Sequence, residues 1–436
     1  MNRRHFLKNT AIGMVGAGVL GQAPVLNAKE KTTGEPEPVK IKAYRTLGRT
    51  GFNASDIATG GTPQPAVLRA VLEAGVNYID TAEGYGRGQS EKNIGEVIKN
   101  FNRKSLFITT KLHLEGDEAK ESILKRARQC LERLQTDYVD CLMMHGCPNT
   151  VSVKNEAFHA AVKQLKSEGR LRFVGISNHG SRFGRIAEES MEKILLAAAA
   201  DGRFDVMLLV YNFVQREMGE RILKACAEKN IGTTLMKTKP VDSYLLMKKR
   251  AEEQSQETEN KERSERAKKA LESFKIIADQ ADNFIKKHNL KNPREIRDAA
   301  VRFVLSNPHV HSVCINFRNF DDIEPYIMLS GSSLSAVDKK KLSLFREGCA
   351  SFYCRHACGQ CESRCPHGVP VNTIMRYNHY FESQGMEKYA MEKYAALAAP
   401  KANLCESCTG HCQAACPYNV HIHALLTLAH RNLTLV

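Results

Sequence analysis

Tryptophan and long apolar runs are both missing from this 436-residue sequence. Without tryptophan, no site can be built on indole stacking. An uncharged stretch does cover residues 9–28, but several glycines together with Gln22, Pro24 and Asn27 interrupt it. Such a stretch is too weakly apolar to make a good membrane span. We therefore expect no transmembrane segment in the mature protein.

The sequence also has no excess of acidic over basic residues. The sequence has 63 Lys and Arg against 48 Asp and Glu, a formal net charge of +15. A basic excess points to nucleic acids or membranes when its charges gather in one place. Here basic and acidic residues are mostly interleaved, as in residues 261–266. We expect a basic soluble surface and no nucleic-acid partner.

The first residues have the order of an export signal. Arg3 and Arg4 begin a charged segment, the weakly apolar stretch follows, and a small residue stands at Ala28. This order is typical of a signal peptide, and the arginine pair followed by residues 6–8 resembles a twin-arginine signal. We predict a signal over residues 1–28, the twin-arginine translocase as a partner, and an exported, periplasmic or extracytoplasmic protein. An uncleaved signal that tethers the protein is the alternative.

Eight short β-type runs alternate with segments of helical apolar spacing between about residues 56 and 326. The runs are residues 57–59, 76–79, 106–109, 138–144, 173–176, 206–210, 233–236 and 312–315. Eight alternations predict an α/β fold, a (β/α)8 TIM barrel. An open doubly wound sheet is the rival, but no Gly-x-Gly-x-x-Gly follows the first run to support it. Residues 245–290 form a long charged helical pattern that either covers the active-site face or is simply solvated.

Four polar residues stand at or just beyond the ends of consecutive predicted strands, where a barrel places its active site. They are Asp80, Tyr85, Lys111 and His145. A single strand-end Lys or His is more often structural, but four together favour a catalytic site.

The sequence around these residues resembles the aldo-keto reductase family. Residues 80–86 read Asp-Thr-Ala-Glu-Gly-Tyr-Gly, residues 90–91 follow as Ser-Glu, and residues 74–79 and 174–178 also match. The resemblance covers about residues 43–330. It implies an oxidoreductase that transfers hydride between a nicotinamide cofactor, NADP(H) or NAD(H), and a small carbonyl or alcohol substrate.

The predicted roles follow from that chemistry. Hydride delivery to a carbonyl leaves negative charge on its oxygen, which needs a proton donor and preorganised positive charge. Tyr85 would be the general acid. Lys111, held by Asp80, would lower the pKa of the tyrosine, because a nearby ammonium stabilises the phenolate. His145 would donate a hydrogen bond to the substrate oxygen.

The same resemblance implies a cofactor site. Ser177 and Asn178 would hold the nicotinamide carboxamide, and Tyr211 would stack on the ring. Arg318, which follows the eighth predicted strand, is the candidate for a 2′-phosphate.

Fourteen cysteines are present, and nine of them follow Ser343. Spacings of two and three residues suit metal centres better than several disulfides, because each disulfide needs its own Cα separation. Eight of the nine form two such groups: Cys354, Cys358, Cys361 and Cys365, then Cys405, Cys408, Cys412 and Cys416. The five scattered cysteines should be buried apolar residues: Cys130, Cys141, Cys147, Cys226 and Cys314.

Both groups follow an iron-sulfur spacing. Bacterial ferredoxins have C-x2-C-x2-C-x3-C-Pro, and the fourth thiolate often binds the other cluster. Each group here has one extra residue and ends in Cys-Pro. Residues 340–436 resemble the helical two-cluster ferredoxin-like domain attached to a subgroup of aldo-keto reductases, so we predict two 4Fe-4S clusters and an electron-transfer partner. Two structural zinc sites are the alternative, and Cys349 is a ninth candidate ligand, in place of Cys354.

The sequence thus predicts an exported aldo-keto reductase with a signal at 1–28, a barrel at 43–330 and an iron-sulfur domain at 340–436. The rival is a non-catalytic exported ligand-binding or redox-sensing protein, in which the barrel is a scaffold and the clusters are structural.

Overall fold

The computed structural model describes residues 38–180, 188–241, 249, 265–290 and 292–434. The described residues from 39 onwards form one compact unit. The predicted export signal over residues 1–28 lies outside the described residues, as does much of the charged pattern at 245–290. None of the described helices is both long and apolar enough to cross a membrane.

Eight parallel strands close into a barrel in the order β10-β3-β4-β5-β6-β7-β8-β9. The strands are β3 (Ile57–Gly60), β4 (Tyr78–Asp80), β5 (Phe107–Leu112), β6 (Val139–His145), β7 (Leu171–Asn178), β8 (Val206–Val210), β9 (Gly232–Met236) and β10 (Ser312–Ile315). Each predicted run is found in one of them, so the (β/α)8 fold is confirmed and the open doubly wound sheet is excluded. Every residue of β5 and β6 is buried, as expected for strands covered on both faces.

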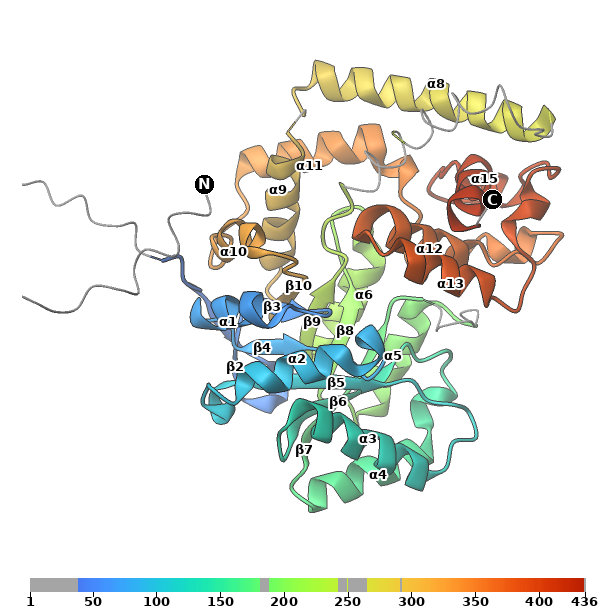
Figure 1. The fold of residues 1–436 in the computed structure, drawn as a ribbon. Helices are drawn as coiled ribbons and strands as arrows, with labels where there is room; N and C mark the ends of the chain where they lie inside the picture. Colours follow the sequence, from blue (N-terminus) through green and yellow to red (C-terminus); the bar gives the residue numbers. More distant parts are fainter. Residues whose placement is uncertain (1–37, 181–187, 242–248, 250–264, 291, 435–436) are drawn as a thin grey trace, which may run out of the picture. The chain divides into compact units, whose positions relative to one another are not determined.

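Amphipathic helices surround the barrel (Figure 1). They are α1 (Pro65–Glu73), α2 (Gln89–Ile98), α3 (Lys120–Leu134), α4 (Glu156–Ser167), α5 (Met191–Asp201), α6 (Arg216–Glu228) and α9 (Pro293–Leu305). In α3, apolar residues three and four apart face the strands, and Ile123, Cys130 and Leu134 are fully buried. Short 3-10 turns occupy Gly48–Thr50, Tyr85–Gly88, Arg103–Ser105, Ser152–Lys154, Phe320–Asp322, Ala350–Phe352, Glu362–Arg364 and Ala402–Cys405.

A small antiparallel hairpin precedes the barrel and was not predicted. Its strands are β1 (Tyr44–Thr46) and β2 (Asn53–Ser55). Leu47, in the turn, is fully buried and belongs to a cluster with Tyr78 and Phe107 inside the barrel. The hairpin therefore fills part of the barrel interior with the Leu47 side chain.

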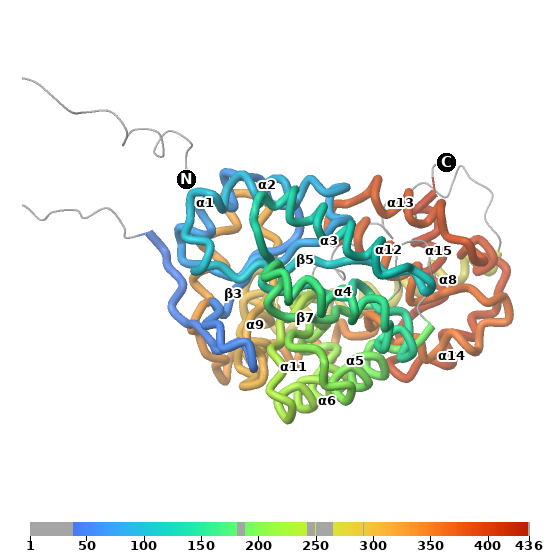
Figure 2. Tube along the Cα trace, turned by 90° about the horizontal axis from the view of Figure 1, so that it is seen from below, coloured from blue at the N-terminus to red at the C-terminus, as the bar shows by residue number. Residues whose placement is uncertain are grey.

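The chain after the barrel is helical. It forms α10 (Ile323–Ile327), α11 (Ala336–Cys349), α12 (Val371–Gln384), α13 (Glu387–Ala395), α14 (His411–Ala414) and α15 (Ile422–Leu433). The apolar side chains of α11 to α15 share one buried cluster with Phe213 and Val214, which follow β8 in the barrel, whereas those of α10 pack in the barrel cluster. Figure 2 follows the chain into this C-terminal segment, drawn in orange and red.

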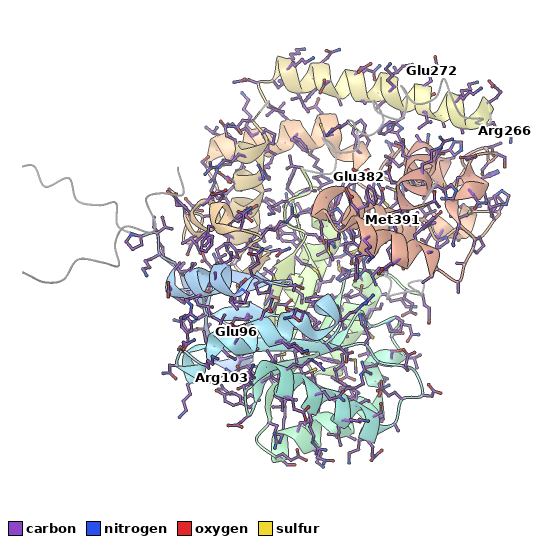
Figure 3. All side chains as sticks on the ribbon, viewed as in Figure 1. Glu96, Arg103, Arg266, Glu272, Glu382 and Met391 are labelled. Carbon is purple, nitrogen blue, oxygen red and sulfur yellow. The ribbon has the colours of Figure 1, made fainter. Side chains whose placement is uncertain are left out.

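The described part of the long charged pattern is helix α8 (Glu265–Lys287). Four of its five buried residues join the same cluster, where the ring centroids of Phe274 and Phe352 are 5.5 Å apart. Arg266, labelled in Figure 3, donates to the carbonyl oxygen of Ser407 at 2.5 Å. Helix α8 therefore packs on the C-terminal segment. The sequence analysis expected either a cover over the active-site face or a solvated helix.

Candidate active site and thiol groups

A buried ion pair lies at the barrel mouth. Asp80 is the last residue of β4, and Lys111 is a fully buried residue of β5. The Lys111 ammonium Nζ donates to Asp80 Oδ2 at 2.7 Å and to the Thr81 carbonyl oxygen at 2.5 Å. Burial raises the pKa of the Asp80 carboxyl, although the lysine charge opposes that shift.

A glycine-rich turn after β4 presents Tyr85. Three successive residues in this turn have positive φ: Gly86 at 57°, Arg87 at 55° and Gly88 at 87°. This left-handed region is open to glycine and costly for other residues, which explains the glycines on either side of Arg87. The turn places the Tyr85 ring beside the ion pair, with Lys111 Nζ 4.7 Å from the ring centroid.

His145, the last residue of β6, completes the group. Its ring lies 5.7 Å from that of Tyr85, edge to face, and stacks on His113 at 4.0 Å. His113 Nδ1 and the His145 carbonyl oxygen are 2.8 Å apart. The structure therefore brings all four predicted catalytic residues, Asp80, Tyr85, Lys111 and His145, into one group.

Burial is the largest influence on the two groups expected to meet the substrate. It raises the pKa of Tyr85 well above its usual value, Asp80 adds to the increase, and Arg376 opposes it. Burial also lowers the pKa of His145 well below its usual value, with His113 and Lys111 adding to the decrease. The net direction for Tyr85 is upward, whereas the sequence analysis expected a pKa lowered by Lys111; burial is the largest cause.

The C-terminal segment lies over the ends of β7, β8 and β9. Gln215, after β8, donates through Nε2 to the His356 carbonyl oxygen at 2.7 Å and accepts the His356 N–H at 2.9 Å. Helix α12 brings Arg376 to the barrel, where its Nη2 is 3.4 Å from Nε2 of His179. The active-site group is thus bordered by residues from both ends of the chain.

The eight clustered cysteines fall into two spatial groups. Cys354, Cys358, Cys361 and Cys416 line one pocket. Burial raises the pKa of Cys405 to about 12, and the thiols that add to this shift are Cys412, Cys365 and Cys408. The last cysteine of each sequence motif therefore lies with the first three of the other motif.

The remaining cysteines lie elsewhere. Cys349 ends α11 and faces Asp282 of α8, and it does not line the thiol pocket. Four of the five scattered cysteines are buried, while Cys314 on β10 is half-buried. Within the described ranges, no three His, Cys, Asp or Glu side chains converge closely enough to hold a single metal ion.

A model of the aldo/keto reductase family matches residues 51–342, well over half of the chain. The chain belongs to the aldo/keto reductase family. Its relatives include the aldo-keto reductase YhdN of Bacillus subtilis (strain 168), 26% identical over 329 residues that cover 71% of this chain and 95% of YhdN. The NADH-specific methylglyoxal reductase of Escherichia coli (strain K12) is 28% identical over 215 residues, 43% of this chain and 62% of that protein.

Among solved structures, the holo form of aldo-keto reductase AKR11C1 from Bacillus halodurans has 20% identity and a TM-score of 0.48. It covers 69% of this chain and 95% of its own. The family and its reductase-named members establish this chain as an oxidoreductase enzyme. They do not favour the rival reading as a non-catalytic binding protein.

Aldo/keto reductases use NAD(P)H, which supports a nicotinamide cofactor, and two of the predicted cofactor residues fit that group. Ser177 pairs in register with His145, and Asn178 follows it. Asn178 donates through Nδ2 to the Cys147 carbonyl oxygen and accepts the Gly180 N–H. An amide side chain has two N–H donors, so one is left for a carboxamide beside His145.

The other two predicted cofactor residues are not brought to this aldo/keto reductase site. The Tyr211 ring packs 5.4 Å from that of Phe303, and its hydroxyl is 3.3 Å from Asn307 Nδ2. It therefore lies in the wall between barrel and helices, unable to stack on a ring at the mouth. Arg318 is exposed and donates to the Ser383 carbonyl oxygen of α12 at 3.2 Å.

Several polar residues of the site were missed by sequence reasoning. They are His113, His179, Lys237, Arg376 and Lys393. The last two come from helices about 290 and about 310 residues after Tyr85, and no local motif marks them. The one available signal was the polar, aromatic-rich stretch of α12 between the two cysteine groups.

Proposed function

We propose that this aldo/keto reductase interconverts a carbonyl and an alcohol through Tyr85, Lys111, Asp80 and His145. The contact that supports this is the Tyr85 ring over the Lys111 ammonium, next to His145. A bound nicotinamide would supply the hydride, with Ser177 and Asn178 beside its carboxamide. Tyr85 delivers the proton to the carbonyl oxygen in reduction and removes it from the alcohol in oxidation.

The other three residues prepare that oxygen site. The Asp80–Lys111 pair places a fixed positive charge next to Tyr85, where negative charge develops on the oxygen. Because its pKa is low, His145 stays neutral and can donate one hydrogen bond to the same oxygen. The surrounding protein excludes water from a charge-developing step.

Replacing Tyr85 with Phe tests the assignment. The variant keeps the ring but loses the proton, so we expect kcat to fall by about 100-fold or more. The measurement is steady-state reduction of a carbonyl panel with NADH and NADPH. Tyr44→Phe is the matched control, since that exposed hydroxyl only donates to the Gly75 carbonyl oxygen. Unchanged turnover in Tyr85→Phe would rule out the mechanism.

We further propose that the enzyme is exported by the twin-arginine route and carries two 4Fe-4S clusters that exchange electrons with a partner. One cluster would be bound by Cys354, Cys358, Cys361 and Cys416, and the other by Cys365, Cys405, Cys408 and Cys412. What supports the clusters is this grouping, in which the fourth thiol of each motif crosses to the other set. Nearby N–H groups contact the sulfurs, including Val369 N–H to Cys365 Sγ at 3.3 Å.

Metal analysis of anaerobically prepared protein tests the clusters. We expect about eight irons per chain. The double variant Cys354→Ser/Cys416→Ser removes two ligands of one cluster and should keep about four irons, whereas Cys405→Ser/Cys416→Ser damages both clusters and should lose nearly all. Cys226→Ala, a buried barrel residue, is the control. Stoichiometric zinc without iron would contradict the proposal, and equal losses in the two double variants would contradict the crossed pairing.

A further inference from the structure

A group of basic side chains lies between the barrel mouth and the C-terminal helices. Arg376 on α12 and Lys393 on α13 are both buried, with 8% and 4% of their surface exposed. His179 follows β7 and is equally buried, and Lys237 follows β9. We call Arg376, Lys393, Lys237 and His179 the basic cluster.

The basic cluster is continuous with the active-site group. The His179 ring lies 6.4 Å from that of His145, which in turn contacts Tyr85. Arg376 reaches His179 and is also oriented by Tyr380, whose hydroxyl accepts from Arg376 Nε at 2.8 Å and from Nη2 at 2.6 Å. The arginine charge is near enough to oppose the rise in the pKa of Tyr85.

Basic groups are concentrated here, and burial together with the Arg376 charge disfavours the protonated forms of the other three. Burial lowers the pKa of Lys237 well below its usual value, and Arg376 lowers it further. Burial also lowers the pKa of Lys393 to about 7, again with Arg376 adding to the decrease. Lys237 Nζ lies over the Tyr380 ring at 5.1 Å, and it makes no salt bridge with any carboxylate in the described part of the chain. Removing a charged group from water costs free energy, and a bound anion would offset part of that cost.

Buried polar atoms at the same place have no protein partner. Among the described residues, Nδ1 of His145 and Nδ1 of His179 make no hydrogen bond. Both rings are more than nine-tenths buried. Buried polar groups in native proteins are nearly always hydrogen-bonded, so these atoms indicate a ligand that completes the site.

We propose that the basic cluster binds the carboxylate of the substrate, so that the enzyme acts on carbonyl acids or hydroxy acids. Arginine is the residue best suited to hold a carboxylate, since its planar guanidinium donates several parallel N–H bonds. The proposal rests on the proposed reaction at Tyr85 and adds the substrate class. It makes the C-terminal segment a part of the substrate pocket, because Arg376 and Lys393 both come from it.

A dinucleotide phosphate would have the same anionic chemistry, but the substrate is favoured by position. Arg376 and Lys393 both act on the pKa of His145, the group expected to hold the substrate oxygen. Barrels often bind phosphates with the loops after strands seven and eight. The loop after the eighth strand carries Asp321 and Asp322, and an Asp322 carboxylate oxygen accepts the Arg318 N–H. Lys237 follows the seventh strand, so the test includes NADPH binding as a separate readout.

The test compares an acid with its neutral ester. Phenylglyoxylate and methyl phenylglyoxylate share the reacting carbonyl and differ in charge. We expect wild-type enzyme to prefer the acid, and Arg376→Gln to reduce kcat/KM for the acid by about 30-fold or more while changing the ester less than about three-fold. Lys388→Gln removes one positive charge from an exposed position of α13 and is the control. Arg376→Lys keeps the charge and should restore part of the preference for the acid.

Other outcomes separate the possible failures. Equal losses for acid and ester, or a wild-type preference for the ester, would overturn the substrate class. Weaker NADPH binding by Arg376→Gln, measured by fluorescence titration with the acid-to-ester ratio unchanged, would assign the cluster to the cofactor instead. If wild-type enzyme reduces no carbonyl, the anion site is tested by measuring the binding of mandelate by calorimetry. Binding that Arg376→Gln abolishes supports the anion site even though the reductase proposal fails, and no binding overturns it.

Discussion

Tyr85 and His145 lie side by side at the barrel mouth, and burial moves their pKa values in opposite directions. The phenol stays protonated at neutral pH because its charged form is disfavoured, and the imidazole stays neutral for the same reason. One group is thus kept as a proton donor and the other as a neutral hydrogen-bond donor. These two protonation states depend on the burial of both side chains, and a motif at a strand end does not show burial.

A pH profile follows from these directions. Reduction needs protonated Tyr85, and the acid form persists until pH approaches its raised pKa. We expect kcat/KM for reduction of a neutral ester to be nearly flat from about pH 6 to about pH 9, well below a tyrosine pKa that is about 10 even when unperturbed. Oxidation of the corresponding alcohol should rise with pH over the same range. A decline in reduction centred near pH 7 would contradict the assignment.

A bidentate ion pair between Arg302 and Asp338 joins helices α9 and α11. Arg302 donates to both carboxylate oxygens of Asp338 at 2.9 Å, and the same carboxylate accepts the Ser335 N–H that begins α11. Asp338 is therefore a bidentate partner and part of a capping box. The pair connects the last barrel helix to the first long helix of the C-terminal segment.

Replacing Asp338 with Ala should lower the free energy of unfolding by about 1–3 kcal/mol, because it removes the cap and leaves Arg302 without its partner. Burial alone would raise the pKa of Asp338, but bonds from Arg302 and Ser335 outweigh it and the net shift is downward. The contribution is present above the unfolded pKa and is lost as pH falls below about 4. Urea denaturation at pH 7 and pH 3 measures both effects. Lys340→Ala on the exposed face of α11 is the control, and equal midpoints for the two variants at pH 7 would contradict the prediction.

At the scale of the whole molecule, residues far apart in sequence build one site. Gln215 and His356 are 141 positions apart, and His179 and Arg376 are 197 positions apart. Helix α8 extends the same connection, since its buried residues pack with the C-terminal helices. The C-terminal segment is thus both the location of the two thiol groups and a wall of the barrel mouth.

The barrel strands were predictable because buried parallel strands read as short apolar runs, and all eight runs match strands. Three of the catalytic candidates followed from strand ends and Tyr85 from its glycine-rich turn, because a barrel gathers such positions on one face. The structure places Tyr211 away from the predicted cofactor site for a related reason. Side chains alternate between the two faces of a strand, and the residue directly after β8 points into the helix layer.

The sequence by itself determined the strands, the strand-end catalytic candidates and the two cysteine motifs, since each is a local pattern with a fixed physical period or spacing. Only the tertiary structure decided which thiols gather together, which way the pKa of Tyr85 moves, and that Arg376 and Lys393 border the active site. Those outcomes depend on burial and on contacts between distant segments, and the spacing of neighbouring residues determines neither.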